Sequence, residues 1–323
     1  MKARLTRRHA LLLAASLAGT GSAWAQADWP SKPVRIVVPF APGGTTDLTA
    51  RIVAEQLGQS FKQTFVIENK AGAGGNVGAN EVAKAAPDGY TFLMGTPGTQ
   101  AINQFLYAKM PYDTAKDLVP VSFVVRVPNV MMLNPGVPAK NIKEFIALAK
   151  AKPGGLSYGT PGNGSTGHLS TELFKTQAGV FVTHIPYRGS GPMLQDLMAG
   201  QVQVAIDNLP SALPLIQAGK LVAIGVTSEQ PVPTLPGVPP IASVLPGYVA
   251  ESWFVLVAPA GTPQPIVNRL SQEIGKALQQ KTMRERFSTV DLTPTTPEGF
   301  AEHIKREMPK WRKVVTEAKI TSL

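Results

Sequence analysis

The chain contains no cysteine, and this absence excludes several kinds of site at once. Disulfide bonds, thiolate metal sites, cysteine nucleophiles and lipid attachment through a cysteine are all ruled out. Histidine is nearly as scarce, with four residues in the whole chain. His9 lies in an N-terminal leader, and the others are too far apart in the sequence to suggest a metal site. We therefore expect no bound metal.

Common catalytic and nucleotide-binding motifs are absent as well. Ser165 and Ser190 follow Asn163 and Arg188 at the second position before them, so neither forms the G-x-S-x-G turn of serine hydrolases. The chain has no H-E-x-x-H sequence and no Walker loop. We expect neither a catalytic residue nor a cofactor.

Negative charge is in short supply. The chain has 21 acidic and 31 basic residues, and its net charge is +10. Four of the basic residues and none of the acidic ones lie in residues 1–25, so the remainder carries +6. Basic residues cluster only near the C-terminus, at Lys305, Arg306, Lys310, Arg312 and Lys313. We interpret that cluster as a solvated helix face and predict no nucleic-acid binding, whereas a mildly positive field favours encounter with small anions.

Residues 1–25 have the composition of a secretory signal peptide. Four basic residues (Lys2, Arg4, Arg7 and Arg8) precede a short apolar segment at 10–18, and Ala23-Trp24-Ala25 matches an A-x-A cleavage site. The apolar segment is shorter than the roughly 20 residues that a membrane-spanning helix needs. We predict cleavage near Ala25, a periplasmic location and no membrane insertion of the mature chain. Export by the twin-arginine or the general secretory route stays open.

Residues 26–323 alternate short β-branched runs with amphipathic segments, which predicts α/β layers built on parallel strands. The predicted strands are 33–39, 64–68, 91–95, 156–159, 180–186, 202–206 and 221–226. The predicted helices are 45–60, 76–85, 143–151, 167–178, 192–199, 212–218, 265–279 and 297–319. Two extended apolar runs, 121–133 and 252–258, indicate strands that cross between two domains. We expect a first domain from 26–125 plus 250–323 and an inserted second domain from 126–249.

Ligands of parallel α/β sheets bind beyond the carboxyl ends of the strands, where loops lead into helices. The first such loop, at 39–47, has two glycines that allow close approach of the backbone and a helix start whose N–H groups can hold an anion. An aromatic residue offers a flat apolar wall. The candidate contacts are Phe40, Gly43, Gly44, Thr45 and Asp47. Asp47 is alternatively a first-turn residue that caps the helix and balances its dipole.

The second loop, at 159–168, contains a G-x-G-x-x-G pattern that is shared with dinucleotide sites. Its context does not fit such a site, because the next strand ends in Tyr187-Arg188 instead of an acidic residue. Glycines, hydroxyls and a helix N-terminus remain, and these favour contact with a second polar or anionic group. The candidate contacts are Thr160, Gly162, Asn163, Gly164, Ser165 and His168. A plain tight turn is the alternative, with His168 as a packing residue.

Three further residues complete the predicted ligand-binding set. Thr96 and Asp207 end strands, and Tyr187 ends the strand that follows the second loop. Asp207 is alternatively part of the N-cap of the following helix. His184 lies inside a strand, where we expect it to be packed in place.

Several segments carry a resemblance to a known family. They are PFAPGGTTDLTAR at 39–51, ENKAGAGGNVG at 68–78, PDGYT at 87–91, SYGTPGNGS at 157–165, HIPYRGSG at 184–191, GQV at 200–202 and APAGTP at 258–263. Through them the sequence resembles the Bug-type extracytoplasmic solute receptors, the receptor component of tripartite tricarboxylate transporters. The segments span nearly the whole mature chain in order, so the resemblance identifies the family. It does not name the ligand.

The resemblance implies a type II periplasmic-binding-protein-like fold. Such a fold has two α/β domains joined by two crossover strands, with a ligand cleft between them that closes like a hinged trap. The loops at 40–47 and 160–168 would face each other across the cleft and hold a ligand carboxylate through N–H groups, hydroxyls and water. The implied partners are a small organic carboxylate and the membrane subunits of a tripartite tricarboxylate-type transporter, and we expect the receptor to be a monomer.

The sequence thus indicates a periplasmic solute receptor that captures a small carboxylate-bearing metabolite, and not an enzyme. One alternative is a periplasmic ligand-sensing subunit of a signalling system that uses the same cleft and has a kinase as partner. Another is a secreted hydrolase or oxidoreductase, which would turn its ligand over. Succinate, citrate, an amino-dicarboxylate, an aromatic acid and a nicotinate-like compound all remain candidate ligands.

Overall fold

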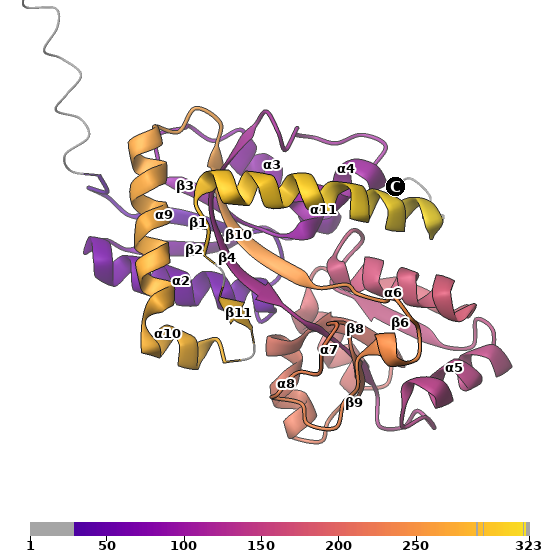
Figure 1. Ribbon diagram of the computed structural model, residues 1–323. Coiled ribbons are helices and arrows are strands. Elements are labelled where there is room, and N and C mark those ends of the chain that lie inside the picture. Colours follow the sequence, from indigo (N-terminus) through magenta and orange to yellow (C-terminus); the bar gives the residue numbers. More distant parts are fainter. Residues whose placement is uncertain (1–28, 289, 293, 319, 321–323) are drawn as a thin grey trace, which may run out of the picture.

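The computed structural model describes residues 29–288, 290–292, 294–318 and 320. The predicted leader and its cleavage site lie outside these residues. Within them, two β-sheets lie side by side, each covered by helices, and strands run from one sheet toward the other (Figure 1). We call the six-stranded sheet with its helices lobe 1 and the five-stranded sheet with its helices lobe 2.

Lobe 1 contains both ends of the described chain. Its sheet has the order β11-β4-β10-β3-β1-β2. The strands are β1 (Val34–Val38), β2 (Phe65–Asn69), β3 (Thr91–Gly95), β4 (Leu118–Val127), β10 (Ser252–Pro259) and β11 (Asp291–Leu292). The helices are α2 (Thr45–Phe61), η1 (Ala73–Gly75), α3 (Asn76–Ala83), η2 (Gly98–Ile102), α4 (Asn103–Leu106), α9 (Gln264–Gln279), α10 (Lys281–Arg286) and α11 (Pro297–Glu317).

The inner strands β1, β3 and β10 of lobe 1 are buried on both faces, as their apolar sequences require. In β1, Ile36 packs into the cluster formed with α2 and α9, whereas the next residue, Val37, packs into the cluster formed with α3 and α11. This alternation follows from the two-residue period of a strand. Because both faces are covered, the polar ends of the strands are the positions left for ligand contacts.

Lobe 2 is the segment between β4 and β10. Its sheet has the order β7-β6-β8-β5-β9. The strands are β5 (Asn129–Leu133), β6 (Ser157–Thr160), β7 (Thr183–Pro186), β8 (Val204–Asn208) and β9 (Val222–Val226). The helices are α5 (Ile142–Ala151), α6 (Thr166–Ala178), α7 (Ser190–Met198), α8 (Leu209–Gln217) and η3 (Ile241–Ser243). One apolar cluster lies under α5 and α6 and the other under α7 and α8.

The chain crosses between the lobes twice. On the first crossing β4 passes through Pro128 directly into β5, and on the second the chain passes from Ala250 into β10. Asn129 joins the two crossings, because its Nδ2 donates to Ala250 O at 2.8 Å. These breaks lie close to the predicted domain limits, and we retain the division into 26–125 plus 250–323 and 126–249 as a proposal.

The structure corrects the expectation of parallel sheets. β1, β2 and β3 are parallel, but β10 runs antiparallel to β3 and β4, and β5 runs antiparallel to β8 and β9. Both sheets are therefore mixed. The strand that enters lobe 1 after the second crossing, β10, and the strand that enters lobe 2 after the first, β5, each run antiparallel to the neighbouring βα strands. The apolar run at 121–133 is divided at Pro128, whose nitrogen has no hydrogen to donate to a ladder.

The longer predicted elements are present, with ends that differ by a few residues. The predicted strand at 180–186 is reduced to β7, Thr183–Pro186. Short elements were not predicted, because a segment of a single turn shows no hydrophobic period; they are η1, η2, α4, η3, α10 and β11. No described helix is both long and apolar enough to span a bilayer.

Candidate ligand-binding site

A narrow cavity lies between the lobes. We call it the central cavity. Both lobes contribute to its lining, which consists of Phe40, Ala41, Gly44, Thr46, Asp47, Thr96, Pro161, Ser165, Thr166, Ser190, Asn208, Ser252 and Phe254. The lining contains two aromatic walls, six hydroxyls, one side-chain amide and one carboxylate, that of Asp47, but no lysine and no arginine.

Four helices begin at the central cavity. They are α2 after Gly44, α6 after Ser165, α7 at Ser190 and α8 after Asn208. The first N–H groups of a helix lack internal partners and carry the positive end of the helix dipole. Side-chain caps are absent from α2 and α7. At the start of α8, Leu209 N donates to Pro128 O and Ser211 N donates to Thr45 Oγ1, so this helix offers its dipole but no free N–H group in this conformation. The cavity is therefore bordered by positive helix ends without a cationic side chain, and its one carboxylate, Asp47, is paired with Arg51. This arrangement suits reversible binding of an anion.

In the first predicted loop, both carboxylate oxygens of Asp47 accept hydrogen bonds from residues of lobe 1. Its Oδ2 accepts hydrogen bonds from Gly43 N at 3.1 Å and from Arg51 Nε at 3.0 Å, and its Oδ1 accepts from Asn69 Nδ2 at 3.0 Å. Burial alone would raise the pKa of Asp47, but these hydrogen bonds outweigh it and lower the pKa. Asp47 thus holds the loop in shape, and Gly43, with φ of +86°, makes the turn.

In the second predicted loop, some donors are already used. Ser165 Oγ caps α6 by accepting from His168 N at 3.2 Å, and Gly164 N donates to His168 Nδ1 at 3.2 Å. The N–H group of Gly164 is therefore already bonded in this conformation, because the side chain of His168 accepts its hydrogen. Ser165 and the next residue, Thr166, still line the cavity.

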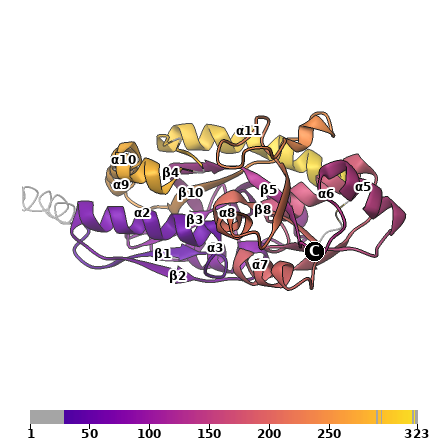
Figure 2. The ribbon, with the colours of Figure 1, turned by 90° about the horizontal axis from the view of Figure 1, so that it is seen from below.

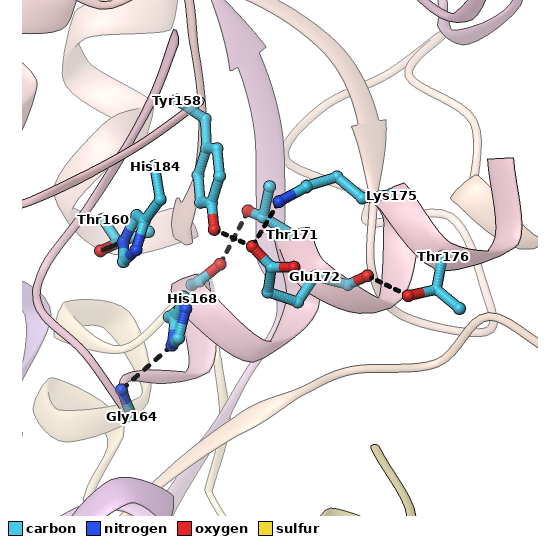
Figure 3. Close-up of polar contacts among 10 residues, drawn as sticks. Tyr158, Thr160, Gly164, His168, Thr171, Glu172, Lys175, Thr176 and His184 are labelled. Atoms are coloured by element: carbon cyan, nitrogen blue, oxygen red, sulfur yellow. Dashed lines mark hydrogen bonds and ion pairs between the residues drawn. The ribbon is translucent and has the colours of Figure 1, made fainter. Parts of the chain in front are cut away.

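Three stacked rings, which we call the histidine stack, support this loop from behind (Figure 3). His168 stacks on His184 with centroids 4.4 Å apart, and His184 stacks on Tyr158 at 4.7 Å. His184 Nε2 lies 2.7 Å from Thr160 Oγ1, and Tyr158 OH donates to Glu172, which is paired with Lys175 at 2.7 Å. Thr160 and His168 are thus structural supports of the loop in this conformation.

Burial keeps the histidines of the stack neutral. It lowers the pKa of His168 to about 4, with a further contribution from Lys175, and lowers the pKa of His184 to about 3, with a further contribution from His168. A neutral His168 can accept the Gly164 hydrogen at Nδ1, whereas a doubly protonated ring could only donate. The loop geometry therefore depends on the uncharged ring.

The lobes touch directly around the cavity. Ala41 N donates to Arg188 O at 2.9 Å, and Thr45 Oγ1 donates to Ser211 Oγ at 3.1 Å. Thr166 Oγ1 donates to Ser252 Oγ at 3.2 Å. The structure thus shows the closed arrangement of the lobes, and Figure 2 shows α2 of lobe 1 beside α8 of lobe 2.

Glycines allow this close approach. A Cβ on Gly74 would overlap Asn163 O, and a Cβ on Gly164 would overlap Asn103 Oδ1 of the other lobe. A Cβ on Gly98 would lie 2.8 Å from Gly164 O. Backbone meets backbone across the cleft, so a side chain at any of these positions would hold the lobes apart.

Asn208 is a functional candidate that the ligand-binding prediction missed. Its side chain is 7% exposed and lines the central cavity, and its Oδ1 has no hydrogen-bond partner among the described residues. A buried amide without partners is costly, so a ligand or water is expected to satisfy it. The sequence signal was its position at the end of β8, next to Asp207, which the prediction chose instead.

Asp207 itself lies behind the cavity wall. It is 1% exposed, and its carboxylate accepts hydrogen bonds from Ser190 Oγ and Ser211 Oγ, each at 3.0 Å. Ser190, Ser252 and Phe254 also line the cavity and were not predicted. The last two lie on β10, where their apolar surroundings indicated only a crossing strand.

A second hollow, which we call the vestibule, opens between the lobes beside the central cavity. Phe40 and Pro161 line both spaces. Gly162, Asn163 and Tyr187 also line the vestibule. Tyr187 OH donates to Asp196 at 2.7 Å. Arg188 brings a cationic side chain to this hollow, with no ion-pair partner among the described residues.

The predicted residues thus fall into three groups. The central cavity receives Phe40, Gly44, Asp47, Thr96 and Ser165. The vestibule receives Gly162, Asn163 and Tyr187. The remaining residues form the turn, the lobe contacts or the support behind the wall: Gly43, Thr45, Thr160, Gly164, His168 and Asp207. Their ligand contacts stay predictions.

Comparisons with known proteins agree with this two-lobed α/β fold. A family model described as tripartite tricarboxylate transporter family receptor matches residues 49–320. The chain belongs to this family. Its members are periplasmic solute-binding receptors and not enzymes. The family and the two-lobed α/β fold predicted from the sequence are therefore confirmed.

Individual relatives cover almost the whole chain. BugT of Bordetella pertussis is 39% identical over 293 residues, which is 90% of this chain and 90% of that protein. The solved structure of R. palustris Rpa4515 with adipate has a TM-score of 0.90 at 42% identity, and covers 92% of this chain and 100% of that one. MatC from Rhodopseudomonas palustris with bound malate has a TM-score of 0.85 at 34% identity, and covers 89% and 100%.

Proposed function

We propose that the mature protein captures a small organic carboxylate in the periplasm, as a monomer, and delivers it to the membrane subunits of a tripartite tricarboxylate-type transporter. The observation that carries the proposal is the convergence of four helix N-termini on a cavity without lysine or arginine. Helix ends hold a carboxylate through fixed dipoles. Family members are receptors, and two relatives have adipate or malate in their structures.

The cavity also indicates how the ligand is oriented. One carboxylate would lie among the starts of α2, α6, α7 and α8, with the Asn208 amide as an additional contact. Phe40 and Phe254 offer apolar walls to a short carbon chain. In a longer diacid, the far end would extend past Phe40 into the vestibule toward Arg188. We therefore favour dicarboxylates among the candidate ligands.

A thermal-shift screen of residues 26–323 against organic acids tests the proposal. Adipate, malate, succinate, citrate, aspartate, benzoate and nicotinate span the candidate chemistries. An acid at 100 times its dissociation constant should add about 2.7 kcal/mol to the free energy of unfolding. Uncharged amides of the same acids are the matched controls and should give no shift. If no acid stabilises the protein, or if an acid is chemically converted, the receptor proposal fails.

A further inference from the structure

Asp207 is a buried carboxylate that lacks a cationic partner. It lies at the end of β8, and its two oxygen atoms accept hydrogen bonds from the hydroxyls of Ser190 and Ser211, each at 3.0 Å. No ion pair joins it to a lysine, arginine or histidine among the described residues. Burial raises the pKa of Asp207 to about 6, although these hydrogen bonds and one from Asn208 N oppose the shift.

The charged groups on neighbouring helices and strands are engaged elsewhere, and Arg188, just before α7, is exposed and lines the vestibule. On α2, Asp47 is paired with Arg51. On α6, Glu172 is paired with Lys175 and bonded to Tyr158 of β6. On α7, Asp196 is bonded to Tyr187. The described residues of β5 and α8 carry no ionisable side chain.

The histidines do not compete with Asp207 near neutral pH. Burial lowers the pKa of His168 to about 4, of His184 to about 3 and of His303 to about 4. Each of these side chains is therefore neutral above pH 6. Among these residues and Asp207, only Asp207 changes charge between pH 6 and pH 8.

A single serine side chain, Ser190, separates the Asp207 carboxylate from the central cavity. Ser190, which donates to Asp207 Oδ1, lines the central cavity, and so does the adjacent residue Asn208. A ligand carboxylate at these helix starts would place a second negative charge close to Asp207 in a space that closure screens from water. Two carboxylates that share such a site do not both ionise readily, because like charges raise the affinity of one of them for a proton.

The hydrogen bonds around Asp207 can accommodate a proton. Ser211 Oγ lies 3.0 Å from Asp207 Oδ2 and 2.9 Å from Asn208 O, so its hydrogen can turn from one acceptor to the other. Once it turns, Ser211 Oγ can accept from a protonated Asp207 and still accept from Thr45 Oγ1 of lobe 1 at 3.1 Å. The contact between the lobes therefore survives in both states.

We propose that carboxylate binding, which rests on the function proposed above, is coupled to the uptake of one proton by Asp207. The proton comes from solvent and forms an O–H bond on the carboxyl group, with no other bond made or broken. The receptor then holds its ligand more tightly at mildly acidic pH and releases it more readily as the pH rises. Asp207 acts on affinity through Ser190 and Ser211 and is a positioning residue that does not touch the ligand.

The direction of the pH dependence follows from linkage. The bound state has the higher proton affinity, so the extra binding is fully present below the pKa of the free protein and is lost as the pH rises through the pKa of the complex. Between these two values the dissociation constant rises by up to about tenfold per pH unit. An acid with one carboxyl group stays ionised from pH 6 to pH 8.5, because its ordinary pKa lies near 4. The last carboxyl of a diacid or triacid has a raised pKa beside the existing charge, so for such a ligand the comparison is made from about pH 7 upward.

Calorimetric titration tests the proposal, with the acid that gives the largest thermal shift as the probe. At pH 7, titrations in phosphate and in Tris buffer should give heats that differ in proportion to the buffer ionisation enthalpies, with up to one proton taken up. The dissociation constant should rise from pH 6 to pH 8.5. This arm needs no variant, so it stays informative even if a substitution at Asp207 prevents folding.

Two variants separate titration from structure. In Asp207→Asn the side chain keeps its shape and can hydrogen-bond to both serines, so binding should persist with a flat pH profile and no proton uptake. The matched control is Asp196→Asn on α7, which removes a carboxylate bonded to Tyr187 and should leave the proton uptake unchanged. A merely structural role of Asp207 would weaken binding equally at every pH.

The outcomes distinguish this inference from the function on which it rests. If an acid binds but the heat is independent of the buffer and the affinity is flat with pH, the coupling is wrong and the receptor function stands. Proton uptake that persists in Asp207→Asn would assign the proton to another group and overturn the proposal as well. If no acid binds, the receptor function fails, and the coupling fails with it.

Discussion

Asn208 shows how much a single side chain can contribute to this site. Its amide is buried in the wall of the central cavity, and its oxygen has no partner among the described residues. An amide can both donate and accept, so it can contact either oxygen of a carboxylic acid or a bridging water. A buried polar group without a partner lowers the free energy of unfolding of the ligand-free protein, and this cost is offset only when a ligand or water bonds to the group.

We expect Asn208→Leu to bind organic acids about tenfold to a hundredfold more weakly, since a hydrogen bond to a charged group contributes about 1.5–3 kcal/mol. The variant should unfold at the same or a slightly higher temperature, because leucine has nearly the same volume and needs no partner. Calorimetric titration and a thermal melt measure the two effects. Asn80→Leu on α3, where the amide oxygen is also buried without a described partner, is the control and should keep the affinity.

The outcome would also decide the place of the ligand. If Asn208→Leu binds the acid as tightly as the unchanged protein, the Asn208 amide does not contact the ligand. The ligand would then be expected to lie nearer the vestibule.

At the scale of elements, the loop before α6 combines two functions. Its glycines let lobe 2 approach lobe 1, and the residues behind it fix its path. Gly164 has φ of +79°, donates its N–H to His168 and lies against Asn103 of lobe 1. The histidine stack then connects the loop to Glu172 and Lys175 in the interior of α6 (Figure 3). Closure therefore depends on the shape of a loop that its own helix holds.

Gly164→Ala should prevent ligand-linked closure, because the new Cβ would overlap Asn103 Oδ1 only when the lobes are together. The expected result is a loss of binding of about a hundredfold or more with a modest loss of stability, on the order of 1 kcal/mol, from the strained backbone. Gly179→Ala is the matched control. Gly179, which ends α6, also has a positive φ, of +61°, but nothing lies within 4 Å of an added Cβ.

Titration of an organic acid with each variant gives the comparison. Equal affinities for the two variants would show that backbone strain alone, and not contact between the lobes, limits binding at Gly164.

For the whole molecule, the two crossings act as the joint of a hinge. Pro128 separates β4 from β5, and Asn129 bonds to Ala250 on the other crossing. Elsewhere the lobes meet through the backbone and hydroxyl contacts around the cavity, and through Leu169 of α6, which packs into the apolar cluster under α11. A ligand that touches both lobes stabilises the closed state by its differential affinity for it.

We expect small-angle scattering of the mature protein to show a smaller radius of gyration with a saturating organic acid than without it. Gly164→Ala should keep the larger radius at the same acid concentration, because its lobes cannot meet. Since the chain has no cysteine, Ser60→Cys with Lys220→Cys provides one label on each lobe for a direct distance measurement. Identical scattering and label distances with and without a bound acid would contradict the hinge.

Much of this architecture could be anticipated from local patterns. The βα units around β1 and β6, the two apolar crossings and the glycine loops before α2 and α6 all follow from periodicity and turn chemistry. The mixed pairing of the sheets could not be predicted from them, because it depends on where the chain re-enters each sheet. Short elements such as α4 and α10 also carry no periodic signal.

The sequence by itself determined the two glycine-lined loops, the absence of cysteine and the family, because these depend on residue types in local order. Only the tertiary structure decided which groups line the cavity. The side chains of Asp47 and His168 bond to their own loops, and Asp207 lies behind two serines that donate to it. The residues Asn208, Ser190 and Ser252 line the cavity. Hydrogen bonding between segments far apart in the chain sets these orientations. A local sequence pattern therefore does not predict which of several adjacent polar side chains is hydrogen-bonded within the protein and which is left to line the cavity.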